Sequence, residues 1–209
     1  MCNLYRMTQN AAEVAKWFAA VDAAAGANFG AEVYPGYPGL VVAGGEVRAM
    51  TWGFPLALTG AKGQALKPRP VNNARTDKLS GPFWRHAFET RRCLIPLDAW
   101  AEAEGPKGRM TRTWLSLPGE DLFAVAGLWR PTPEWGAAYA MVMTDTAGCE
   151  AEAVHDRMPV VLAPADYGRW LEGSPEEAFA LCRTWDGPLA IDRTREPWAK
   201  GAGVQASLF

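Results

Sequence analysis

The chain lacks the long apolar and leader segments that membrane and secreted proteins carry. No stretch approaches the ~20 apolar residues that a membrane-spanning helix requires. The start of the chain also lacks the basic segment and apolar run of a signal peptide. We therefore expect a cytoplasmic protein with no membrane partner. The 209 residues are 49% apolar and 21% charged, which is typical of one globular domain with a substantial core.

Metal-ligating and cofactor-binding patterns are equally scarce. The four cysteines have no C-x-x-C spacing, and only two histidines, His86 and His155, are present to complete a metal site. Gly-x-Gly-x-x-Gly and P-loop patterns are absent. We therefore expect no metal and no cofactor, and no disulfide in a reducing compartment.

Positive charge is concentrated in one block, although the whole chain has a net charge of −2. Residues 62–92 hold eight Lys/Arg against two Asp/Glu, while the segments before and after are net negative. Phe83 and Trp84 lie inside this block, and Trp52 lies just upstream. Cations with aromatics suit a strand of phosphates and unstacked bases. A solvated basic face has the same pattern, and charge alone does not decide between them.

Short strand-like segments follow one another through the middle of the chain. A helix over 11–25 is expected first, capped by Thr8 or Asn10, followed by a hairpin of residues 40–42 and 47–52. Residues 60–80 are expected to form an irregular loop, and the last dozen residues to fray. Further strands are predicted at 92–96, 98–102, 112–117, 122–129 and 138–144, with helices at 83–90, 148–154, 163–171 and 175–182, and residues 160–162 are apolar. The fold class is therefore α+β, with a mainly antiparallel, barrel-like sheet and helices packed around it.

The second residue is a cysteine. If Met1 is removed, Cys2 presents an α-amine and a thiol on neighbouring carbons. Such an aminothiol adds to an aldehyde twice, through an imine that the sulfur closes into a thiazolidine. The α-amine titrates at about 7.7–8.0, so more of it is neutral at physiological pH than of a lysine amine. From Met-Cys alone, an ordinary residue after the initiator is the better interpretation.

Five motifs in order resemble the SRAP family (SOS response-associated peptidase; abasic-site DNA–protein crosslinking proteins). They are MCN at 1–3, WGFP at 52–55, NNARTD at 72–77, RRCLIPLDAWAE at 91–102 and HDRMP at 155–159. The resemblance implies a single domain over 1–209, with a mixed α/β fold and a groove for single-stranded DNA. It implies a catalytic set and a set of DNA contacts. The catalytic set is Cys2, Asn73, Glu102 and His155; the DNA contacts are Arg75, Trp52 as a stacking residue, Pro38, Gly53, Arg85, Arg157 and Arg6.

The chain departs from the family pattern at two places. Asn3 and Leu4 follow Cys2, where the family often has Gly-Arg, so Arg6 is the candidate to replace the missing arginine. Residues 99–103 read Ala-Trp-Ala-Glu-Ala in place of the family's Gly-Phe-Tyr-Glu-Trp. Glu102 is kept, but the packing around it must differ.

The resemblance implies that Cys2 traps abasic sites in single-stranded DNA as a thiazolidine after Met1 is removed. It also implies self-processing peptidase activity on Met1, and the imine stage permits a weak lyase activity. The expected partner is single-stranded DNA near the nucleoid, with no obligate protein partner. Two alternatives stay open: an amidohydrolase or peptidase with an N-terminal cysteine nucleophile, and a non-catalytic single-strand binder.

Overall fold

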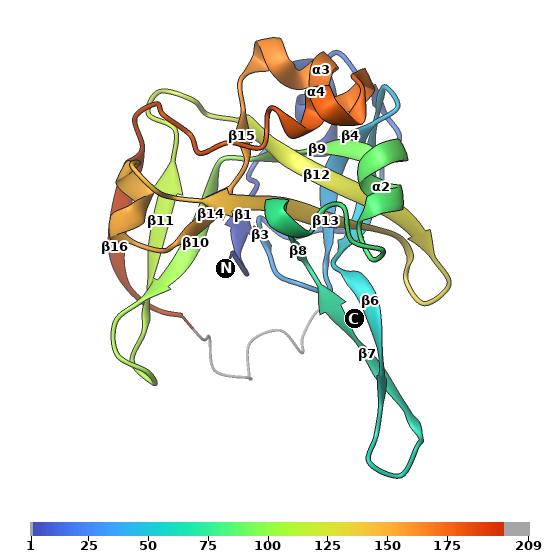
Figure 1. The fold of residues 1–209 in the computed structure, drawn as a ribbon. Helices are drawn as coiled ribbons and strands as arrows, with labels where there is room; N and C mark the ends of the chain where they lie inside the picture. The colour runs from blue at the N-terminus through green and yellow to red at the C-terminus, as the bar shows by residue number, and fades with distance from the viewer. Residues whose placement is uncertain (1, 199–209) are drawn as a thin grey trace.

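The computed structural model describes residues 2–198, and five of its strands close into a barrel (Figure 1). Strands β12 and β13 form an antiparallel hairpin, β12 pairs with β9, and β9 pairs with β4. The β4–β5 hairpin completes the ring, because β5 pairs in parallel with β13. The expected α+β, barrel-like architecture is confirmed. The barrel strands are β4 (Pro38–Ala43), β5 (Glu46–Trp52), β9 (Arg92–Leu97), β12 (Phe123–Thr132) and β13 (Gly136–Asp145).

Short strands extend the barrel at its edges. The parallel pairing of β8 with β13 and the antiparallel pairing of β14 with β13 place the segments next to two of the predicted site residues, Asn73 and His155, on one long strand. The added strands are β2 (Val21–Asp22) on β5, β8 (Asn73–Arg75) and β14 (Arg157–Pro159) on β13, and β15 (Val161–Leu162) on β12.

A second sheet carries the amino-terminal segment. Its strand order is β16-β11-β10-β1-β3, and Tyr5 lies opposite Trp100 in the β1–β10 pair. This register brings the residues before β1 alongside the end of β10. The strands are β1 (Tyr5–Arg6), β3 (Glu32–Val33), β10 (Ala99–Glu104), β11 (Thr111–Ser116) and β16 (Ala190–Pro197).

Two strands, β6 (Phe54–Thr59) and β7 (Ala65–Val71), form an arm that projects from the body of the molecule (Figure 1). The prediction of an irregular loop over 60–80 is therefore wrong. Gly60 and Gly63 lie in the turn that connects the two strands, and Gly63 has a φ of 80°. Leu58 of β6 pairs with Leu66 of β7 across this hairpin. After β8, the chain forms a single turn of 3-10 helix, η1 (Thr76–Lys78).

The helices are short and cover the barrel. Asn10 caps the first helix through a capping box with Glu13. It is one of the two residues that the sequence offered as caps. This helix ends well before residue 25, because Ala19 adopts a positive φ and Val21–Asp22 pairs with β5. The predicted fraying falls on residues 199–209, outside the described part of the chain. The helices are α1 (Ala11–Trp17), α2 (Arg85–Thr90), α3 (Tyr167–Glu172) and α4 (Pro175–Phe179), with 3-10 turns η2 (Glu150–Ala153) and η3 (Pro164–Asp166).

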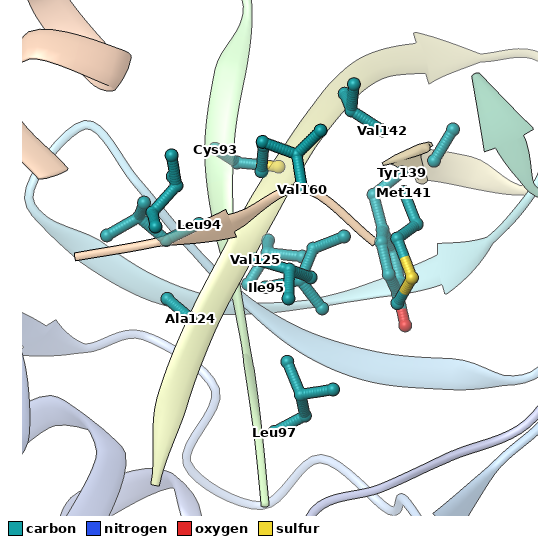
Figure 2. Packing of buried hydrophobic residues seen from close by; sticks show 14 of the residues in the cluster. Cys93, Leu94, Ile95, Leu97, Ala124, Val125, Tyr139, Met141, Val142 and Val160 are labelled. Atoms are coloured by element: carbon teal, nitrogen blue, oxygen red, sulfur yellow. The ribbon is translucent and has the colours of Figure 1, made fainter. Parts of the chain in front are cut away.

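No helix within residues 2–198 is long and apolar enough to cross a membrane. The core is made by the barrel strands, and Ile95 of β9 lies beside Val125 of β12 in it (Figure 2). Tyr139 of β13 reaches across to Tyr5 of β1, and their hydroxyl groups form a hydrogen bond. The barrel and the second sheet are therefore joined through a buried polar contact.

Gly39 of β4 lies where these two tyrosines meet. A Cβ atom added to Gly39 would stand 2.2 Å from each hydroxyl oxygen, far inside van der Waals contact. Both side chains are fully buried, so neither can swing away without opening the core.

We predict that Gly39→Ala lowers the free energy of unfolding by about 1–3 kcal/mol, as for other overpacked cores. Gly168→Ala is the matched control, because no atom lies within 4 Å of its added Cβ. Urea unfolding of both variants measures the difference. Equal midpoints for Gly39→Ala and wild type would contradict the packing described.

Candidate active site

The structure brings together the four residues predicted to be catalytic, using both sheets. The β1–β10 pairing places Cys2 near Glu102, which lies on β10 opposite Thr113. Strand β13 pairs with β8, which contains Asn73. It also pairs with β14, which follows His155. The site thus forms where the second sheet meets the barrel.

Two side-chain amides hold the backbone carbonyl of Cys2. The Nδ2 group of Asn73 donates to this oxygen at 2.7 Å, and the Nδ2 group of Asn72 donates to it at 3.0 Å. Asn72 also donates to Oδ1 of Asn3 at 3.1 Å. Because a carbonyl oxygen has two lone pairs, the two amides can fill its acceptor capacity and fix the orientation of Cys2.

Asn72 is the site residue that the sequence interpretation missed. Its own carbonyl accepts hydrogen bonds from the indole of Trp52 at 3.1 Å and from the backbone of Met141 at 2.9 Å. The doubled asparagine in NNARTD was the available signal. Residues 60–80 were expected to form an irregular loop, which gives no direction for either side chain, so the pattern did not suggest that both amides reach one acceptor. Asn72 lies in a one-residue break between β7 and β8, and this break allows its amide to reach the same carbonyl oxygen as the amide of Asn73.

The Cys2 thiol is fully buried, with 0% of the residue exposed. Its Sγ donates to the carbonyl of Leu4 at 3.4 Å. Burial raises the pKa of the thiol well above its usual value, and the nearby Glu102 carboxylate raises it further. The thiol therefore stays protonated at neutral pH.

Glu102 is also enclosed, with 2% of the residue exposed. Burial is the main reason that its pKa rises from 4.5 to about 7, and the charge of Asp156 adds to the increase. At neutral pH this carboxyl group is divided between its two protonation states. It can therefore both accept and donate a proton, as a general acid–base group must.

His155 lies beside Glu102, with 4.0 Å between Nε2 and Oε2. Burial lowers the pKa of the imidazole, which favours the neutral ring. Its Nδ1 accepts the backbone N–H of Arg157 at 3.0 Å, so the proton of the neutral ring is on Nε2, toward Glu102. Asp156 Oδ1, 2.8 Å from Nδ1, is placed to accept a proton from the charged ring.

Positive charge lines the adjoining surface. Arg75 forms a two-point ion pair with Asp77, which holds the pKa of that carboxyl below its usual value, and Arg157 is close enough to contribute. Pro38 is exposed at the start of β4, and Arg85 is exposed at the start of α2.

Gly53, with a φ of 118°, packs so closely on Pro70 that an added Cβ would stand 2.5 Å from the proline Cβ. Its role in the structure is this close packing.

The structure contradicts the expectation that Trp52 stacks on DNA. Trp52 is 0% exposed, packs against Tyr5 and Tyr139, and uses its indole N–H to hold Asn72. A ring enclosed in this way offers no face to a base.

Two other expectations from the sequence also change. Trp84 is buried, and Phe83 packs on it beneath the guanidinium of Arg130, so these aromatics belong to the core and its border. Arg6 forms an ion pair with Asp98 at 2.5 Å and lies over the ring of Trp114. These contacts occupy its guanidinium and argue against Arg6 as the replacement for a DNA-binding arginine.

No group of three or more His, Cys, Asp or Glu side chains in the described part of the chain is arranged to hold a metal ion. The described arrangement can hold an amino-terminal residue, transfer protons beside it and present cations at its edge. This combination suits addition to a carbonyl group on an anionic substrate.

Comparison with known proteins agrees with this geometry. A family model described as SOS response associated peptidase (SRAP) matches residues 1–193. The abasic site processing protein YoqW of Bacillus subtilis is 36% identical over 123 residues, which are 54% of this chain and 54% of that protein. YobE of the same organism, also called an abasic site processing protein, is 33% identical over 105 residues, covering 47% of this chain and 48% of its own length. The chain therefore spans about half the length of the curated relatives it matches.

Solved structures share the fold. A protein from Bacteroides thetaiotaomicron superposes with a TM-score of 0.76 at 19% identity, covering 92% of this chain and 91% of that chain. A protein from Bordetella bronchiseptica gives 0.75 at 22% identity, covering 92% and 99%. At these identities the likeness supports the fold alone.

The pKa of Glu102 predicts a specific dependence of stability on pH. Because the folded chain holds this proton more tightly than the unfolded chain, the free energy of unfolding should fall as pH rises from 4.5 to about 7. The loss through this one group is on the order of 3 kcal/mol.

Glu102→Gln removes this titration and keeps the shape of the side chain. Relative to wild type, the free energy of unfolding of the variant should therefore increase as pH rises from 4.5 to about 7. Outside this range the difference between the two proteins should stay constant. Urea unfolding at a series of pH values measures this, and His155 titrates in both proteins. A constant difference across the window would show that Glu102 has an ordinary pKa.

Proposed function

Because the chain belongs to the SOS response associated peptidase (SRAP) family, we propose that it processes abasic sites in single-stranded DNA through Cys2. The observation that supports this most directly is the double hydrogen bond from Asn72 and Asn73 to the Cys2 carbonyl. It fixes the second residue of the chain beside two proton-transfer groups, Glu102 and His155. A buried structural cysteine would need neither.

The first step requires the amine of Cys2. Removal of Met1 releases it, either by this site or by a cellular aminopeptidase. Hydrogen bonds to the Cys2 carbonyl draw electron density from the neighbouring Cα, which favours the neutral, nucleophilic amine. The buried surroundings act in the same direction, because burial disfavours a charged ammonium group.

The second step opens the sugar. An abasic deoxyribose is mostly a closed hemiacetal, and its hydroxyl proton must move for the aldehyde to form. Neutral His155 carries its proton on Nε2, and Glu102 lies 4.0 Å from it, so each group can exchange a proton with the sugar hydroxyl groups. This pair supplies the acid and the base that ring opening needs.

The third step forms the covalent link. The Cys2 amine adds to the aldehyde carbon and a water molecule leaves, which gives an imine. The S–H group then adds across the C=N bond: the sulfur bonds to the carbon, and the proton passes to the nitrogen through Glu102. The thiazolidine forms without an oxidant or reductant. The imine also permits strand cleavage by β-elimination, which we propose as a minor lyase activity.

The same features argue against a thiol amidohydrolase. A cysteine nucleophile attacks as the thiolate, and such sites lower the thiol pKa. Here burial raises the pKa of Cys2. Ring closure onto an imine consumes a protonated thiol, so the raised pKa is compatible with the proposed addition.

We predict that Cys2→Ala gives no heat-stable adduct with an abasic single-stranded oligonucleotide. The variant keeps an α-amine and should still form an imine that borohydride traps. Intact-mass measurement after heating tests this, the wild-type adduct having the summed mass less one water. Cys149→Ala is the control and should keep the adduct. A heat-stable adduct with Cys2→Ala would falsify the proposed chemistry.

Asn72 provides a second test. Asn72→Asp keeps the size of the side chain but replaces both N–H donors by an acceptor facing the Cys2 carbonyl. We expect adduct formation to slow by about tenfold or more, as for the loss of one buried hydrogen bond. Asn3→Ala, which removes only the other acceptor of Asn72, should leave the rate close to that of wild type. Equal rates for Asn72→Asp and Asn3→Ala would exclude this positioning role.

A further inference from the structure

An apolar hollow opens between α1, the segment that leads into β12, and α3. Its volume is about 180 Å³, and its lining includes the aromatic side chains of Trp17, Tyr167 and Trp185. Pro118 and Pro164 add further apolar surface. None of the described residues of the candidate active site lines this hollow, and α3 lies well apart from the amino terminus in Figure 1. The hollow is therefore separate from the candidate active site.

The aromatic side chains of the hollow leave space between them. The ring of Tyr167 packs on Phe18, with 5.5 Å between the ring centroids. Neither Trp17 nor Trp185 stacks on another aromatic ring within residues 2–198. Trp17 is also 52% exposed. Its indole is therefore available to a ligand.

Negative charge stands at the rim of the hollow. Glu120 lines the hollow and also lines an adjoining groove of about 400 Å³ that contains Asp98 and Asp121. Burial raises the pKa of Tyr167 to about 12, and the charge of Glu120 adds to the increase, which places this carboxylate near the ring.

The carboxylates of Glu120 and Asp121 are not neutralised. Both residues are exposed, and neither forms an ion pair with any residue between 2 and 198. Arg6 also lines the groove, but it is already paired with Asp98. A cation is therefore the complementary ligand for this rim.

The size and chemistry of the site match one amphipathic side chain. Pockets that enclose a whole small-molecule ligand measure roughly 300–1,000 Å³, so a hollow of about 180 Å³ fits a single side chain better. Arginine combines an apolar stem with a charged head. Its planar guanidinium group stacks on aromatic faces and forms two-point bonds with carboxylates. An apolar hollow with a carboxylate at its rim offers both kinds of contact.

We propose that this hollow binds an arginine side chain from an extended segment of a partner protein. The stem and guanidinium group lie against the aromatic rings, and the guanidinium group pairs with Glu120. Because the hollow opens into the groove, the residues next to the arginine lie along Asp98 and Asp121. A polyanion does not suit this rim, since its carboxylates would repel it. The inference is independent of the chemistry proposed for Cys2.

The test follows the indole N–H signals of Trp17 and Trp185 by nuclear magnetic resonance of the full, isotope-labelled chain. Addition of the peptide acetyl-Gly-Arg-Gly-amide should shift both signals saturably, whereas the signals of the buried Trp52 and Trp100 should not move. The control peptide carries citrulline, which has the shape of arginine without its charge, and should bind about tenfold more weakly. Equal binding of the two peptides, or no shift with the arginine peptide, would overturn the proposal.

Two variants test the lining residues. Glu120→Gln and Trp17→Ala should each weaken binding of the arginine peptide by about fivefold to tenfold, because they remove the charge partner and an aromatic face. Glu176→Gln and Phe179→Ala are the matched controls, since they remove an exposed carboxylate and an exposed ring from α4, outside the hollow. Equal affinities for Glu120→Gln and Glu176→Gln would contradict the ion pair.

Two competitors test the identity of the occupant. A peptide with lysine in place of arginine should bind more weakly, because the ammonium group neither stacks nor forms a two-point bond. Equal binding of the lysine peptide would overturn the assignment to arginine. Displacement of the arginine peptide by an oligothymidine strand at the two indole signals would show that the hollow accepts a polyanion, which contradicts the proposal.

Discussion

The hydrogen bonds from Asn72 and Asn73 to the Cys2 carbonyl are the constraint on which the site depends. Cys2 belongs to the segment that enters the second sheet through β1, whereas both asparagines stand at the edge of the barrel beside β13. The two bonds therefore join separate sheets at Cys2. Each contributes only about 1 kcal/mol net, but leaving a buried carbonyl without donors costs more. A residue this close to a chain end would otherwise be expected to move.

Burial determines the electrostatics of the same region. It raises the pKa of the Cys2 thiol, raises that of Glu102 to about 7 and lowers that of His155. All three shifts disfavour charge, as expected where water is excluded. The result is a group of uncharged or partly charged acids and bases around Cys2. Such a site suits imine and thiazolidine chemistry, in which protons move at each step and no stable ion is formed.

The sequence predicted the barrel strands well, because their apolar β-prone segments are separated by clear turns. It failed where a residue's setting depends on distant neighbours. A tryptophan next to a glycine and a proline at a strand end can be buried or exposed. Only the contacts of Trp52 with Tyr5 and Tyr139 show that it is buried. Asn72 was expected to lie in an irregular loop, whereas it occupies a single-residue break between two strands, which directs its amide toward Cys2. The chemistry proposed for Cys2 came from family motifs, since Met-Cys alone did not indicate it.

The basic block shows why counting charge along a chain does not define a surface. Arg92 counted toward it, yet this side chain is buried and donates to the carbonyls of Phe88, Trp170 and Gly173, which fastens α2 and α3 to β9. Lys67 and Arg69 have no such partners within residues 2–198 and stand on an arm that leads straight into Asn72. One part of the block therefore stabilises the barrel, and another is exposed on the arm that precedes Asn72. Burial, which sequence composition cannot report, separates the two roles.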